Sequence, residues 1–133
     1  MRTAHAYLAR GIAAAVVVQF FLAGAGAFGA SSFAPHRTLG WLLLLLAVVE
    51  MLFALSGRVR VRHSGVLLAA VGLQVALGVL GSDTSAWFGA LHAVNALVVM
   101  GAAATLARPS DDFRSPRRSE SAAGSNPQPR RAP

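Results

Sequence analysis

Two histidines, His36 and His92, are the residues of this sequence best suited to chemistry. Each lies at or inside a long apolar run, where an imidazole needs a hydrogen-bond partner or a ligand. Two imidazoles on different helices of a four-helix bundle can hold the iron of a b-type haem between them. The alternative is that the two are unrelated, with His36 among lipid headgroups beside Arg37 and His92 hydrogen-bonded within the bundle.

Glu50 is the second candidate, because it is the only acidic residue within an apolar run. A charged carboxylate at that depth is costly, so it must be neutral or paired. No basic residue falls at its level, and we therefore expect a neutral Glu50 hydrogen-bonded to Gln19 or Gln74. Proton or quinone handling is the alternative to a structural role. His5 and His63 fall outside the apolar runs, so no special role is expected for them.

Each apolar run carries one polar residue near its middle: Gln19, Glu50, Gln74 and Asn95. Counting about 1.5 Å per residue from the nearest arginines places these residues about 12 to 20 Å into the membrane. We expect an interhelical hydrogen-bond layer, in which each bond contributes about 0.6 kcal/mol.

The elements that position these residues are four apolar helices. Only 13% of the 133 residues are charged, whereas a soluble domain is about a quarter charged. Runs of about 16 to 24 residues match a bilayer core of about 30 Å when they are helical. The sequence therefore predicts an all-α, four-helix transmembrane bundle with helices at about residues 7–30, 38–56, 65–80 and 86–107.

The two ends of the chain have sequence features that the middle of the chain lacks. Residues 108–133 are rich in Ser, Pro and Arg, which predicts a disordered tail. The first run could instead be a signal peptide, since Ala25-Gly26-Ala27 resembles a cleavage site, although an apolar region of about 7–15 residues is usual for signal peptides and this run is longer.

Arginine placement predicts the orientation. All twelve basic residues are arginines; Arg37 lies on one side of the alternating topology and the other eleven lie on the opposite side. Positive charge marks the cytoplasmic side, so both termini and the tail are expected there.

An Ala-, Gly- and Arg-rich chain without Lys suggests a bacterium, hence its inner (cytoplasmic) membrane. The absence of Cys excludes disulfides and cysteine metal sites.

The two halves of the chain resemble each other weakly. When His36 is aligned with His92, Gln19 falls one residue from the position of Gln74. Such a repeat predicts two parallel hairpins related by an axis along the membrane normal.

Three short motifs carry a resemblance to known families: Phe28-Gly29-Ala30-Ser31-Ser32-Phe33, His36-Arg37-Thr38-Leu39-Gly40 and Leu91-His92-Ala93-Val94-Asn95-Ala96. With them, residues 4–107 resemble a family of small bacterial four-helix membrane proteins of unknown function. The two His motifs resemble, more distantly, one half of haem A synthase, which implies ligands on the second and fourth helices towards the outer face. In that case Arg37 could pair with a haem propionate, and Gly40, Gly89 and Ala93 could leave room for the ring.

We therefore expect a multi-pass membrane protein that is not an enzyme, has an accessory or structural role and needs no cofactor. Its partners would be the lipid bilayer and a second copy or another membrane protein, with no nucleic acid. The alternative is a haem-b or quinone-linked electron carrier that uses His36 and His92. Depth disfavours that alternative, because His36 lies about 33 Å from Arg58 and His92 only about 24 Å from Arg108. We expect the two rings to lie on different levels and not to share an iron.

Overall fold

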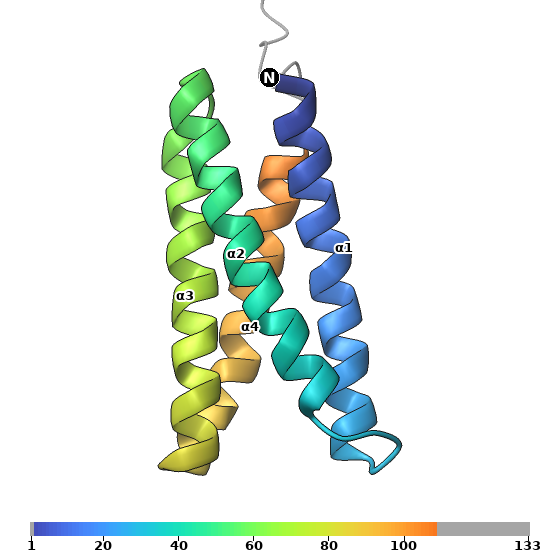
Figure 1. The fold of residues 1–133 in the computed structure, drawn as a ribbon. Coiled ribbons are helices and arrows are strands. Elements are labelled where there is room, and N and C mark those ends of the chain that lie inside the picture. Colours follow the sequence, from blue (N-terminus) through green and yellow to red (C-terminus); the bar gives the residue numbers. More distant parts are fainter. Residues whose placement is uncertain (1, 109–133) are drawn as a thin grey trace, which may run out of the picture.

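The chain folds as four long helices and the short connections between them. The computed structural model describes residues 2–108, and these form α1 (Arg2–Ala27), α2 (Ala34–Gly57), α3 (Val61–Asp83) and α4 (Ala86–Ala107) (Figure 1). All four are long and apolar enough to cross a membrane. The predicted all-α, four-helix transmembrane bundle is confirmed, while the tail predicted for residues 108–133 lies, apart from Arg108, outside the described residues.

Three helices extend beyond the apolar runs that predicted them. α1 begins at Arg2 instead of residue 7, α2 begins at Ala34, and α3 spans residues 61–83 instead of 65–80. Hydropathy marks only the apolar part of a helix, whereas the backbone remains helical through polar end residues whose side chains reach water or headgroups. Pro35 stands in the first turn of α2, where its missing N–H is not needed. α4 has the predicted bounds, and the Ser85 side chain accepts from the Trp87 N–H at its start.

The helices form a ring in which each packs against the two that flank it: α1 against α2 and α4, and α3 against α2 and α4. α2 is strongly tilted, so that it lies beside α3 at one end and beside α1 at the other (Figure 1). We call the first end the basic end; it carries the start of α1, the α2–α3 connection with Arg58 and Arg60, and the end of α4. The opposite end, with the α1–α2 and α3–α4 connections, is the hairpin end.

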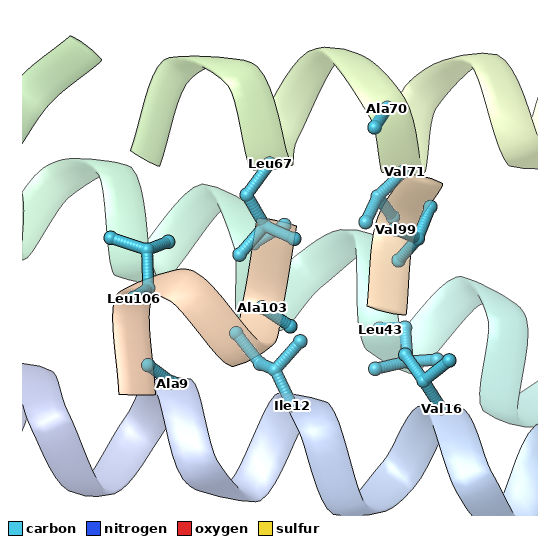
Figure 2. Packing of buried hydrophobic residues seen from close by; sticks show 11 residues of the cluster. Ala9, Ile12, Val16, Leu43, Leu67, Ala70, Val71, Val99, Ala103 and Leu106 are labelled. Carbon is cyan, nitrogen blue, oxygen red and sulfur yellow. The ribbon is translucent and has the colours of Figure 1, made fainter. Parts of the chain in front are cut away.

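The tightly packed core fills the half of the bundle towards the basic end. Its side chains meet in successive layers contributed by all four helices (Figure 2), and the cluster comprises Ala9, Ile12, Val16, Leu43, Ala47, Leu67, Ala70, Val71, Val99, Ala103 and Leu106. Many large apolar side chains point outward instead, among them Phe21, Trp87 and Leu97, which are 73%, 80% and 66% exposed. An apolar outer surface is what a membrane bundle needs, because lipid tails are as apolar as the core.

At the hairpin end, α3 and α4 touch through glycine backbone. A Cβ added to Gly81 would lie 2.7 Å from the backbone N of Gly89, which is closer than real side chains approach. Small residues at a helix interface allow this approach, and it replaces side-chain packing in the part of the bundle that has no buried core.

We expect Gly81→Ala to destabilise the bundle by about 1–3 kcal/mol, because the added methyl group must push the two backbones apart. The melting temperature of the purified protein in detergent measures this. The control is Gly101→Ala, where a Cβ meets nothing within 4 Å. Equal melting temperatures for the two variants would contradict the close approach.

Candidate functional site

His36 and His92 face each other across the centre of the bundle. Their ring centroids are 5.9 Å apart and the ring planes make an angle of 69°. They come from α2 and α4, which are diagonal in the ring of helices and do not pack against each other directly. The expectation that the two rings lie on different levels is therefore wrong.

The error arises because the depths of the two histidines were counted from Arg58 and Arg108 as if these arginines lay at one level. α4 ends short of the level that α1, α2 and α3 reach at the basic end (Figure 1). Arg60 bridges this step, since its guanidinium donates to the carbonyls of Thr105, Leu106 and Arg108 at 3.0–3.1 Å. Arg58 and Arg108 thus do not mark one plane. Together with the tilt of α2, this absorbs the offset of about 9 Å that the count implied.

Both rings are held by the same kind of hydrogen bond. Nδ1 of His36 lies 3.2 Å from the carbonyl oxygen of Gln19 on α1, and Nδ1 of His92 lies 2.8 Å from that of Gln74 on α3. A carbonyl oxygen can only accept, so each imidazole donates from Nδ1, and in its neutral form each keeps the lone pair on Nε2. This is the tautomer of a histidine that coordinates a metal through Nε2 while a backbone carbonyl fixes its other nitrogen.

The α3–α4 hairpin supports its histidine with a connected network. Gln74 Nε2 donates to the carbonyl of His92 at 2.9 Å, and Gln74 Oε1 accepts from Asn95 Nδ2 at 2.7 Å. Asn95 also donates to the carbonyl of Ala70. A Cβ on Gly78 would lie 3.1 Å from the His92 ring, so the imidazole packs directly on α3. The expected interhelical hydrogen bonds of Gln74 and Asn95 are confirmed.

The α1–α2 hairpin repeats the histidine bond but not the network. Gln19 precedes His36 by 17 residues and Gln74 precedes His92 by 18, which matches the one-residue shift seen in the sequence alignment of the halves. The Gln19 side chain reaches α2, where its Nε2 lies against Gly40, but its Oε1 is buried without a hydrogen-bond partner among the described residues. Leu39 occupies the position that corresponds to Asn95. His36 is therefore held less firmly than His92.

A cavity of about 880 Å³ surrounds the two rings. One core side chain from each helix lines it and forms its floor: Val16, Leu43, Val71 and Val99, which meet as one layer in Figure 2. Its walls include the small residues Gly40, Gly89 and Ala93, and Arg37 and Ser82 line it too, close to the hairpin connections. The site is thus an apolar chamber with two imidazoles inside it and a cation near the hairpin end.

Glu50 belongs to a different site. Its side chain is completely buried, and its Oε1 lies 2.7 Å from Nδ1 of His5. The Ser64 hydroxyl donates to the same oxygen at 3.5 Å. The expected partners Gln19 and Gln74 are wrong, and so is the placement of His5 outside the membrane helices, because His5 is buried against Glu50. The sequence analysis missed His5 because the apolar run begins at Tyr7, whereas α1 begins at Arg2 and carries residue 5 into the bundle.

We expect Glu50→Gln to fold with nearly wild-type stability and Glu50→Lys to lose about 2.5–3.5 kcal/mol, because lysine places a charge in an apolar site beside a histidine. Yield and melting temperature in detergent measure the difference. Asp83→Lys, at an exposed position, controls for the change of charge. If both Glu50 variants melted alike, the buried contact with His5 would be contradicted.

Comparison with known proteins gives one finding. A family model described as a family of unknown function (DUF6220) matches residues 19–81, from Gln19 on α1 to Gly81 on α3. The match includes His36 and Glu50 but stops before His92. No curated protein and no solved structure matches the chain significantly, so the resemblance to haem A synthase stays a prediction. Four apolar helices and this match fit a small multi-pass membrane protein similar to a family of unknown function.

Proposed function

We propose that this bundle binds one b-type haem between His36 and His92 and serves as a membrane electron carrier. The observation that supports the proposal is the pair of imidazoles facing each other across the bundle with their ring centroids 5.9 Å apart, each fixed through Nδ1 by a carbonyl of the neighbouring helix. An accessory role without a cofactor would not require the two rings to face each other in this matched arrangement.

The residues present fit the group. Two Fe–N bonds of about 2 Å separate the ligand nitrogens by about 4 Å, which the spacing of the rings accommodates. A carbonyl that accepts from Nδ1 fixes the orientation of the ring and raises the basicity of Nε2. The cavity around the rings is large and mostly apolar, and its lining includes the small residues Gly40, Gly78 and Gly89.

Each part of the chamber has a distinct task in this proposal. A bound haem supplies one-electron chemistry. The valine and leucine floor keeps water out of the chamber from the basic end. Arg37, which lines the cavity near the hairpin end, can pair with a propionate by charge-assisted hydrogen bonds. Gly78 and the Gln74–Asn95 network hold the His92 ring in one orientation.

An absorption spectrum tests the proposal. We expect protein purified in detergent from haem-replete cells to show a Soret band and about one haem per chain by the pyridine haemochrome assay. His36→Ala and His92→Ala should each lose most of the bound haem, because each removes one axial ligand. His63→Ala is the matched control, since His63 is exposed and lies outside the chamber. Wild-type protein that is helical by circular dichroism but takes up no added haem would contradict the proposal.

We also infer that the basic end faces the cytoplasm, so that the haem chamber lies in the outer half of the membrane. Support comes from the arginines, because Arg58 and Arg60 lie at the same end as the start of α1 and the end of α4 (Figure 1), and positive charge favours the cytoplasmic side.

Reporter fusions test this orientation. We expect a fluorescent protein fused after Pro133 to be active and a phosphatase that works only outside the cytoplasm to be inactive there. The same phosphatase inserted between Ser31 and Ser32 should be active. The reverse pattern would contradict the orientation and leave the haem proposal standing.

A further inference from the structure

A second buried polar site lies near the basic end, away from the histidine chamber. His5 from α1, Glu50 from α2 and Ser64 from α3 meet there with exposed fractions of 5%, 0% and 0%. Fourteen residues of α2, or about 21 Å of helix, separate Glu50 from His36. The haem proposal does not use this site, and the inference drawn from it does not depend on haem.

The polar atoms of the site are only partly satisfied. Oε1 of Glu50 is close to both His5 and Ser64. Oε2 of Glu50 and both ring nitrogens of His5 are buried and have no hydrogen bond among the described residues, although Nδ1 of His5 lies 2.7 Å from Oε1 of Glu50. Leaving such an atom unpaired costs about 1–3 kcal/mol, and a chemical role, a bound water or ion, or stored strain can account for it. Here Oε2 of Glu50 and Nε2 of His5 flank the short nitrogen–oxygen contact.

We propose that the His5–Glu50 pair is a proton-loading site that takes a proton from the aqueous phase at the basic end of the bundle. The imidazole has one nitrogen turned towards Glu50 and a second nitrogen free to receive the proton. Loading forms an N–H bond at Nε2 of His5, breaks the N–H bond at Nδ1 and forms an O–H bond at Oε1 of Glu50. The pair gains one proton and no electron moves.

The neighbouring groups explain why the pair takes a single proton. With an ionised carboxylate and a neutral imidazole, the pair carries a negative charge in an apolar site, which is costly. After loading, both side chains are neutral. Arg60, which directly precedes α3, lies close enough to His5 for its charge to act on the imidazole, and it opposes a further positive charge there. α3 also contributes the Ser64 hydroxyl, and α4 contributes the carbonyls of Thr105 and Leu106 that Arg60 binds.

The position of His5 provides the route. It lies on the second turn of α1, next to the end of the bundle that holds the arginine-bearing α2–α3 connection. Basic residues at a helix end lie at the headgroup level, where water is present. A proton therefore reaches His5 before it reaches Glu50, and the fully buried carboxyl exchanges with solution through the imidazole.

The small number of glutamates allows a direct test. The chain has two, Glu50 and Glu120, and Glu120 lies outside the described residues. In a Glu120→Gln background, glutamate labelled with ¹³C at the side-chain carboxyl reports on Glu50 alone. We expect its carbon NMR resonance, recorded in detergent, to move between two limiting positions as the pH of the solution changes. A resonance that stays at one position over the whole pH range in which the protein is folded would overturn the proposal.

A second variant tests the relay through the imidazole. His5→Asn in the same background keeps a side-chain N–H near the position of Nδ1 but removes the second ring nitrogen. We expect the carboxyl of Glu50 to exchange its proton with solution on the order of a hundredfold more slowly than in the parent. His63→Asn is the control and should exchange at the parent rate. If His5→Asn is folded by circular dichroism and also exchanges at the parent rate, the relay is overturned.

Discussion

The hydrocarbon core of a membrane offers no water, so the polar groups within these four helices depend on the protein for their hydrogen bonds. Oε1 of Gln19 and the unpaired atoms of the His5–Glu50 pair are exceptions among the described residues. Unsatisfied groups there cost several kcal/mol each. This constraint explains why the imidazoles of His36 and His92 donate to backbone carbonyls of neighbouring helices, and why Arg60 reaches the last carbonyls of α4. The same bonds that satisfy these groups also fix their orientation. In this bundle, the hydrogen bonds that replace water around the polar side chains also hold those side chains in the geometry of a site.

The tilt of α2 decides where the bundle is filled and where it is open. Near the basic end α2 packs with α3 over a continuous apolar core (Figures 1 and 2). Towards the hairpin end it approaches α1 instead, and α3 and α4 pair closely through Gly81 and Gly89. The two hairpins therefore leave a partly open cavity of about 880 Å³ between them. A bundle with parallel helices would bring the same small residues together and leave no such space.

Sequence reasoning predicted the number of helices, because long uncharged runs have few alternatives. It also selected His36, His92 and Glu50, since polar residues in such runs are few. It failed where helix ends and tilt matter. The depth of His36 relative to His92 was counted from Arg58 and Arg108, which lie at unequal heights. His5 was placed outside the bundle because the apolar run begins at Tyr7, whereas the helix begins at Arg2. No signal in one sequence gives the tilt of α2, which results from side-chain packing of all four helices. The partner of Glu50 could have been found only by extending α1 to its true start.

The internal repeat connects both sites. Residues on α1 correspond to residues on α3 at an offset of 55, as Gln19 does to Gln74, and residues on α2 correspond to those on α4 at an offset of 56, as His36 does to His92. At the basic end the same offsets relate His5 to Arg60 and Glu50 to Leu106. In one hairpin His5 contacts the Glu50 carboxylate, and in the other Arg60 donates to the Leu106 carbonyl.

Each hairpin thus has contacts between its two helices at two levels, one near the hairpin end and one at the basic end. The side chains that make these contacts differ in their chemistry. At the hairpin end both halves carry a histidine, and the two rings face each other with their centroids 5.9 Å apart. At the basic end the two halves differ. One pair contains two groups that can exchange a proton, whereas the other joins the Arg60 guanidinium to a backbone carbonyl, which has no proton to exchange. The bundle therefore has one site to which both halves contribute a histidine and a second site, formed by His5 and Glu50, that only one half contains.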